Sequence, residues 1–204
     1  MLQSVERADA LLGQLTTGLQ SLSHAKQVAL VVVSDHGMAA PNTTQVSLIP
    51  EAATRSHIRT VSVGPMVAIH TDGYRQSLEL RDQLNNSLDN AHAYLRENIP
   101  IHLHHRSNRR IGDVVVIPEG TGIVRPTRDA NIPAGMHGWD PTFKDMHGIF
   151  MASGPGLRPG TRLDQVRSID VYPFLATLLG LQPHEDVAGT ITAFESALSA
   201  PALP

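Results

Sequence analysis

Apolar residues near the N-terminus recur every three or four positions, and this period predicts an amphipathic helix. The stripe consists of Val5, Ala8, Leu12, Leu15, Leu19 and Leu22. A continuous apolar run from Val28 to Val33 follows it and predicts a buried strand. A helix that leads into a buried strand is half of a βαβ unit, so we expect a preceding sheet element to cover the stripe. Without that element, the stripe and a sheet edge should be exposed.

Short apolar runs and helical stripes alternate along the rest of the chain. Strands are predicted at residues 46–49, 61–63, 66–69, 111–117 and 149–152. Leucines and alanines at helical spacing predict a helix from about residue 77 to residue 98, closed by Pro100. Ser168 can cap a last helix that ends at Gly180, with an inward face of Val171, Leu175, Leu178 and Leu179.

The alternation of strands and helices indicates an α/β fold. We expect an α/β core built from residues 1–50 and 133–195, with a mixed or parallel sheet flanked by helices. The alternation is irregular between these parts, so residues 51–132 are predicted to form a smaller inserted subdomain. Residues 196–204 are expected to be a tail.

Composition narrows the function classes. The chain has 204 residues and a formal net charge of −3, with acids and bases interspersed, which argues against a nucleic-acid partner. It has no cysteine, so any metal must be held by nitrogen and oxygen ligands. No stretch approaches the roughly 20 apolar residues of a membrane span. The first residues also lack the basic and apolar regions of a signal peptide.

Candidate chemistry lies directly after the strand at 28–33. The sequence Ser34-Asp35-His36-Gly37-Met38 places a carboxylate beside an imidazole where the strand ends. This is where open α/β sheets hold ligands. Asp-His-Gly alone is also typical of a turn. A second element, His137-Gly138-Trp139-Asp140, favours the functional interpretation, since Asp35, His36 and His137 would suit zinc, which in catalytic sites takes three protein ligands.

Several motifs together resemble the type I phosphodiesterase and nucleotide pyrophosphatase family of the alkaline phosphatase superfamily. In chain order they are residues 31–38 (VVVSDHGM), 97–100 (ENIP), 104–113 (HHRSNRRIGD), 137–140 (HGWD), 146–156 (MHGIFMASGPG), 169–173 (IDVYP) and 178–181 (LLGL). The resemblance covers nearly the whole chain. Ser-Asp-His-Gly alone also occurs in sulfatases and phosphoglycerate mutases, so the ordered set carries the assignment.

The resemblance implies an alkaline-phosphatase-like fold and phosphoryl transfer at two zinc ions. In that family a threonine nucleophile forms a covalent intermediate, and two metals stabilise the attacking and leaving oxygens. By resemblance, Asp35 and His36 bind the zinc that contacts the nucleophile, and His137 binds the other zinc. Trp139 and Pro141 stand where the family tends to carry Tyr or Phe and Asn, which alters the surroundings of the metal histidine.

The family's nucleophile and remaining zinc ligands come from a region that would precede Met1. We therefore expect the N-terminal part of the fold to be missing, no catalytic nucleophile in this chain, and an inactive isolated chain. The leading hypothesis is a fragment of a two-zinc hydrolase that acts on a phosphodiester or nucleotide-like small molecule. The family leans toward a periplasmic or secreted location, which the chain itself does not reveal.

Two alternatives stay open at this stage. The chain could be a non-catalytic binding or complementation module whose partner is an N-terminal fragment. It could instead belong to the sulfatase or phosphomutase branch of the superfamily, although the elements around His137 and Ile169 weaken that reading.

Overall fold

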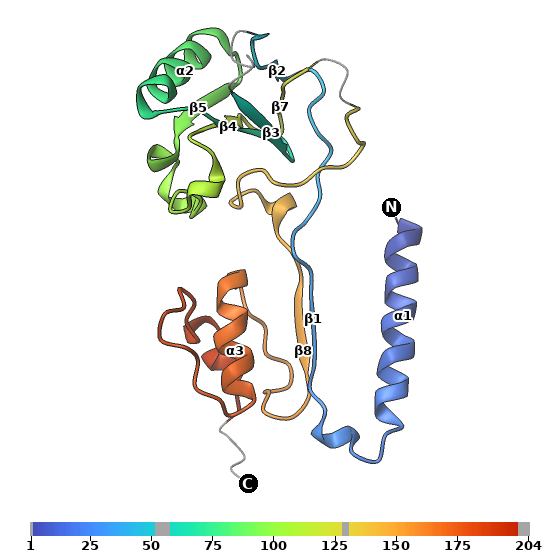
Figure 1. Cartoon of the computed structure of the whole chain (residues 1–204). Helices are drawn as coiled ribbons and strands as arrows, with labels where there is room; N and C mark the ends of the chain where they lie inside the picture. Colours follow the sequence, from blue (N-terminus) through green and yellow to red (C-terminus); the bar gives the residue numbers. More distant parts are fainter. Residues whose placement is uncertain (1, 52–57, 128–130, 200–204) are drawn as a thin grey trace. The chain divides into compact units, whose positions relative to one another are not determined.

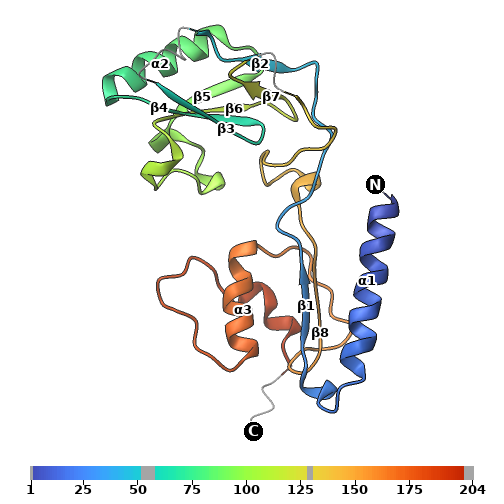
Figure 2. The same cartoon turned by 45° about the vertical axis from the view of Figure 1, so that its right-hand side comes forward.

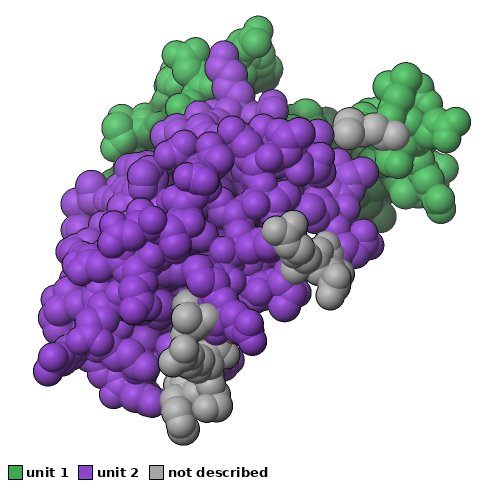
Figure 3. All heavy atoms as spheres, turned by 90° about the horizontal axis from the view of Figure 1, so that it is seen from above, with its two compact units in different colours: residues 1–35, 149–204 green, residues 36–148 purple. Residues whose placement is uncertain are grey.

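The computed structural model describes residues 2–51, 58–127 and 131–199, which divide into two compact units. Unit 1 consists of residues 1–35 and 149–204, and unit 2 of residues 36–148 (Figure 3). These bounds differ from the division at residues 51–132 expected from sequence, because unit 2 also takes in the segment after Asp35 and the one before Ile149. Within the described residues, no helix has both the length and the apolar character needed to cross a bilayer.

Unit 1 contains the first helix, a two-stranded ladder and the last helix (Figure 1). The helix α1 spans Leu2–Gln20, and the ladder joins β1 (Leu30–Val33) to β8 (Phe150–Ser153). The strands are antiparallel, with Leu30 opposite Ser153 and Val33 opposite Phe150. The helix α3 follows at Val171–Leu178. Unit 1 therefore pairs strands that are more than a hundred residues apart in sequence.

Three phenylalanines form the core of unit 1. Phe174 of α3 and Phe194 are buried, and their ring centroids lie 4.5 Å apart. Phe150 of β8 packs against both, with centroid distances of 5.4 Å to Phe174 and 5.0 Å to Phe194. Offset and edge-on contacts at these distances stabilise a core beyond the area they bury. The cluster ties β8, α3 and the C-terminal segment together.

Unit 2 is built on a four-stranded antiparallel sheet with the order β3-β4-β6-β5 (Figure 2). The strands are β3 (Arg59–Val63), β4 (Met66–His70), β5 (Ala91–Leu95) and β6 (Val114–Pro118). A short parallel pair, β2 (Val46–Leu48) with β7 (Ile123–Arg125), completes the unit. The helix α2 (Tyr74–Ser87) joins β4 to β5. The α/β class is confirmed, and most of the strand pairs are antiparallel.

One face of this sheet forms the core of unit 2. Leu80 and Leu84 of α2 pack against Ala91, Ala93 and Leu95 of β5. Val114 and Val116 of β6 join the same cluster. Because successive strand residues point to opposite faces, the intervening residues of β5 and β6 lie on the other side of the sheet.

The helix predicted for residues 77–98 is wrong in its second half. The structure ends α2 at Ser87, turns through Asn90 with a φ of 58°, and then forms β5. The apolar residues Ala91 and Leu95 fit a helical stripe, but they also fit the period of a strand together with Ala93. Pairing of β5 with β6 decides between these two periods, because burial in a sheet outweighs local helix preference.

The inward face expected for the last helix is wrong at two of its four residues, since Val171 and Leu178 are partly buried. The buried residues of α3 are Pro173, Phe174 and Ala176, whereas Leu175 and Leu179 are exposed. The contact of Phe174 with the aromatic core sets the rotation of the helix. Ser168 begins a 3-10 turn rather than the helix itself. Gly180 ends the helix as expected, with a φ of 70°.

The apolar stripe of α1 is incompletely covered. None of the residues of α1 is buried: Val5 and Leu15 of the stripe are at least half exposed, whereas Leu12 and Leu19 are partly exposed. A helix with one apolar face normally buries that face against another element. Within the described residues, the stripe is therefore only partly covered.

An ion pair between exposed Arg167 and buried Asp170 fixes the turn that leads into α3. Asp170 is 2% exposed and accepts hydrogen bonds from Nε and a terminal nitrogen of Arg167 at 2.9 and 2.8 Å. It also accepts one from the Thr190 amide at 2.9 Å. The Arg167 guanidinium holds the pKa of Asp170 below its usual range, against an opposing effect of burial. Asp170 therefore joins this turn to the segment around Thr190.

The depressed pKa of Asp170 predicts an acid-sensitive contact. Its contribution to stability is present above the unfolded-state pKa of about 3.9 and disappears as pH falls through the lower folded-state pKa. We expect the exchange protection of the Thr190 amide, corrected for intrinsic rate, to fall as the pH drops below about 4. In Asp170→Asn, protection should already be low at neutral pH, whereas Asp164→Asn at an exposed position of the same unit should resemble wild type. Protection that persists unchanged into acid would contradict this account.

Candidate functional site

A pair of backbone hydrogen bonds brings the two candidate motifs together within unit 2. The Ala39 amide donates to the Met136 carbonyl at 2.9 Å, and the Met136 amide donates to the Ala39 carbonyl at 2.8 Å. His36 and His137 lie just beyond this bridge, and their rings stack with centroids 3.5 Å apart and planes 11° from parallel. Two of the three predicted metal ligands are therefore neighbours in space, about a hundred residues apart in sequence.

Asp35 is the third predicted ligand. It is the last residue of unit 1, it is exposed, and it follows β1. The strand ends at Val33, before Asp35 and His36, so these two adjacent side chains are not held on opposite faces of a regular strand. Among the described residues, no group of three or more His, Cys, Asp or Glu side chains is arranged to hold a metal. The metal assignment of Asp35, His36 and His137 thus stays a prediction.

The orientation of His36 suits a metal ligand. Its Nδ1 lies 2.7 Å from the carbonyl oxygen of Gly37. A carbonyl only accepts, so Nδ1 carries the proton in this contact and Nε2 carries the lone pair. A backbone carbonyl that fixes the tautomer in this way is typical of metal-ligating histidines. The donor type and tautomer at His36 therefore fit zinc.

Gly37 is required by the close approach of another chain segment. Its amide donates to the Met146 carbonyl at 2.9 Å. A Cβ at this position would lie only 2.0 Å from the Asp145 carbonyl oxygen and 2.7 Å from that of His147. The glycine thus lets the chain after His36 run directly against the segment at 145–147.

The turn between β3 and β4 packs against the backbone of His137 and Gly138. Gly64, with a φ of 57°, leaves room for the His137 carbonyl, which would lie 2.9 Å from a Cβ placed there. Pro65 packs beneath Gly138, whose φ is 101°. Both positive φ angles favour glycine. Backbone packing of this turn therefore holds the loop that carries His137.

Arg125, which the sequence analysis did not single out, links the same two segments. It is 7% exposed at the end of β7 and donates to the Gly64 carbonyl at 2.9 Å. Its second terminal nitrogen lies 3.8 Å from the sulfur of Met136, the residue before His137. Burial lowers the pKa of Arg125. The sequence feature that could have identified Arg125 is its position as a charged residue directly after the apolar pair Ile123 and Val124.

Asp140, in the second motif, forms its own hydrogen-bonded cluster. It accepts from Nε2 of His102 at 2.7 Å and from the amide and hydroxyl of Thr142 at 2.8 and 2.7 Å. Burial alone raises the pKa of Asp140, but the bonds from His102 and Thr142 outweigh it, so the pKa lies below its usual range. His147 lies 3.1 Å from the Pro141 carbonyl. These histidines have hydrogen-bonding roles in the described part of the chain.

Comparison with protein families and curated proteins gives concordant matches. The profile of the family "Type I phosphodiesterase / nucleotide pyrophosphatase" matches residues 1–140, more than half of the chain. Human bis(5'-adenosyl)-triphosphatase ENPP4 is 27% identical over 185 residues, and the venom phosphodiesterase of Naja atra is 29% identical over 196 residues. Each alignment covers 90% of this chain, but only 40% and 23% of those proteins, respectively.

Solved structures show the same relation. Human ectonucleotide pyrophosphatase/phosphodiesterase 5 superposes with a TM-score of 0.84 at 25% identity, over 97% of this chain and 52% of that chain. An inactive variant of the murine protein, in complex with AMP, gives a TM-score of 0.83 at 28% identity. The chain thus spans about half of these structures and less than half of the curated relatives.

The close approach at Gly37 generates a stability prediction. In Gly37→Ala, the new methyl group overlaps the Asp145 carbonyl, so we expect a loss of about 1–3 kcal/mol or more in unfolding free energy. Gly73→Ala is the matched control, because a Cβ there meets nothing within 4 Å. Urea unfolding followed by the fluorescence of Trp139 measures both. Equal stabilities for the two variants would show that the packing at Gly37 is not needed.

Proposed function

Because this chain belongs to the type I phosphodiesterase / nucleotide pyrophosphatase family, we propose that it is part of a zinc hydrolase that cleaves phosphodiester or pyrophosphate bonds in nucleotides. The observation that carries the proposal is the stacking of His36 on His137, because these two residues belong to different family motifs. The relatives' names support the substrate class, since they include a bis(5'-adenosyl)-triphosphatase and a protein in complex with AMP.

In this proposal, Asp35 and His36 hold one zinc ion and His137 holds the other. Bound zinc supplies Lewis-acid stabilisation of the charge on the attacking and leaving oxygens. The protein's own part is orientation: the Gly37 carbonyl fixes the tautomer of His36, and the turn at Gly64 and Pro65 holds the His137 loop. Arg125 secures that turn through its hydrogen bond to Gly64.

We further propose that the threonine nucleophile and the remaining zinc ligands are supplied by sequence outside this chain. The chain covers about half of the solved relatives, and the exposed stripe of α1 is the kind of surface that another part of a domain covers. On this proposal the isolated chain binds zinc weakly and does not turn over substrate. An inactive isolated chain would therefore not contradict the activity proposed for the complete protein.

A metal titration tests the ligand assignment in the isolated chain. We expect Zn²⁺ to bind and Co²⁺ to give a visible spectrum typical of nitrogen and oxygen ligands. His36→Ala or His137→Ala should weaken binding at least about tenfold, since each removes a ligand. His24→Ala, at an exposed position of unit 1, is the matched control. If all three variants bind zinc as wild type does, these histidines are not the ligands.

An activity assay tests the proposed function directly. The isolated chain should leave bis-p-nitrophenyl phosphate and diadenosine triphosphate intact in the presence of zinc. Joined to the family's N-terminal half, it should hydrolyse both, and His36→Ala should reduce kcat/KM by at least about a hundredfold. A folded, zinc-loaded fusion without phosphodiesterase activity would overturn the proposal. Activity on an aryl sulfate alone would favour the sulfatase branch.

A further inference from the structure

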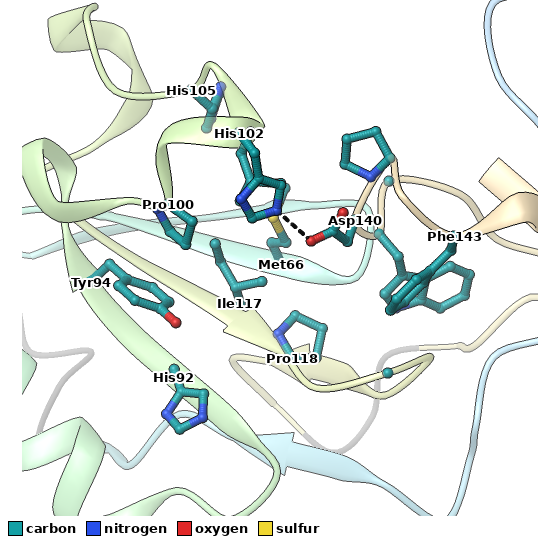
Figure 4. Close-up of a pocket in the computed structure, with 15 residues that line it drawn as sticks. Met66, His92, Tyr94, Pro100, His102, His105, Ile117, Pro118, Asp140 and Phe143 are labelled. Carbon is teal, nitrogen blue, oxygen red and sulfur yellow. Dashed lines mark hydrogen bonds and ion pairs between the residues drawn. The ribbon is translucent and has the colours of Figure 1, made fainter. Parts of the chain in front are cut away.

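A pocket of about 480 Å³ lies within unit 2, on the face of the sheet opposite α2 (Figure 4). His92 and Tyr94 of β5 line it, whereas their neighbours Ala91, Ala93 and Leu95 belong to the core on the α2 side. Its volume is within the range of small-molecule sites. The pocket therefore uses the face of the sheet that the core leaves uncovered.

Apolar groups form most of its wall, and several of them are flat rings. Tyr94, Trp139 and Phe143 contribute aromatic rings, and Figure 4 shows Tyr94 and Phe143 on opposite sides of the pocket. Trp139 is fixed in place, because it is 6% exposed and its indole N–H donates to the Gly122 carbonyl at 2.7 Å. Pro100 and Pro118 add further flat surface. Such walls favour a flat ring over a globular group.

The polar edge of the pocket is a carboxylate. Asp140 lines it, and the hydrogen bonds from His102 and Thr142 keep its pKa below the usual range. Those three donors occupy three of roughly four acceptor positions of a carboxylate, so one remains for a ligand on Oδ2. Figure 4 shows Asp140 joined to His102 at the rim of the pocket.

The charges around the pocket favour a cation. Among the described residues that line it, none is Lys or Arg. A second carboxylate, Glu119, lies beside the pocket, with Oε1 2.9 Å from Nε2 of the lining residue His92. When the imidazoles are neutral, Asp140 and Glu119 together give the site a negative potential. Phosphate-bearing groups are therefore poor ligands here, and aromatic faces attract cations as well.

We propose that this pocket binds a planar aromatic cation, with the charged edge of the ligand on Asp140 and its ring between Tyr94 and Phe143. The residues that line the pocket do not include the predicted zinc ligands Asp35, His36 and His137. Ligands of this class are aryl amidines, aminopyridinium ions and protonated nitrogen heterocycles. The aromatic walls select the flat ring and the carboxylate selects the charge.

Trp139 provides a direct readout, since it is the only tryptophan of the chain and lines the pocket. We expect benzamidine to change its fluorescence saturably at about pH 8, where a free imidazole is uncharged. Benzoate, which has the same shape and the opposite charge, should not bind. Tetramethylammonium, a cation that is not planar, should bind at least about tenfold more weakly.

Two variants separate the charge from the aromatic wall. Asp140→Asn should weaken benzamidine binding at least about tenfold, because it removes the charge and keeps the shape. Phe143→Leu should weaken it about threefold to tenfold. Asp72→Asn, at an exposed carboxylate before α2, is the matched control and should bind as wild type does. Unfolding midpoints close to that of wild type would confirm that the variants are folded.

Three results would overturn this proposal. The first is the absence of saturable benzamidine binding to the wild-type chain. The second is benzoate binding as tight as that of benzamidine, which would show a site without charge preference. The third is equal affinity for tetramethylammonium and benzamidine, which would show selection of charge without a flat ring. None of these results depends on zinc or on hydrolysis, so they test the pocket without testing the proposed hydrolase function.

Discussion

The mutual hydrogen bonds between Ala39 and Met136 are the constraint on which the candidate site depends. They hold two segments together that are separated by about a hundred residues, and His36 and His137 are each within three positions of them. The loop-closure entropy of such a contact must be offset by packing. The buried cluster of Ala39, Met136, Trp139 and Met146 provides that packing. The stacking of the two imidazoles therefore depends on this small apolar cluster.

Two glycines and one buried arginine fix the positions of the segments that carry His36 and His137. Gly37 allows the chain to pass against residues 145–147, and Gly64 allows the β3–β4 turn to reach the His137 carbonyl. Arg125 donates to the same turn from beneath. Its burial lowers its pKa, yet an arginine stays protonated at neutral pH, so its hydrogen bonds persist. The loop of His137 is thus held mainly by backbone contacts.

The two faces of the sheet in unit 2 have different roles: one packs in the core and the other lines the pocket. Its α2 face carries the leucine and valine core, and its opposite face presents His92, Tyr94 and Ile117 to the pocket. Strand alternation assigns each residue of β5 to one of these two tasks. The same alternation explains why the sequence predicts a helix at 91–95 where the structure has a strand: the apolar residues there satisfy both periods, and only pairing with β6 selects the strand.

The sequence by itself determined the family, the α/β class and the strands at β1, β4, β6 and β8, because these depend on local periodicity and on motif order. The zinc ligands that it indicates, Asp35, His36 and His137, stay a prediction. It also predicted the first helix and its apolar stripe. Tertiary structure decided the end of α2, the inward face of α3, the role of Arg125 and the pocket around Asp140. Each of these depends on contacts between residues far apart in sequence, and side-chain period alone carries no information about which distant segment supplies the partner.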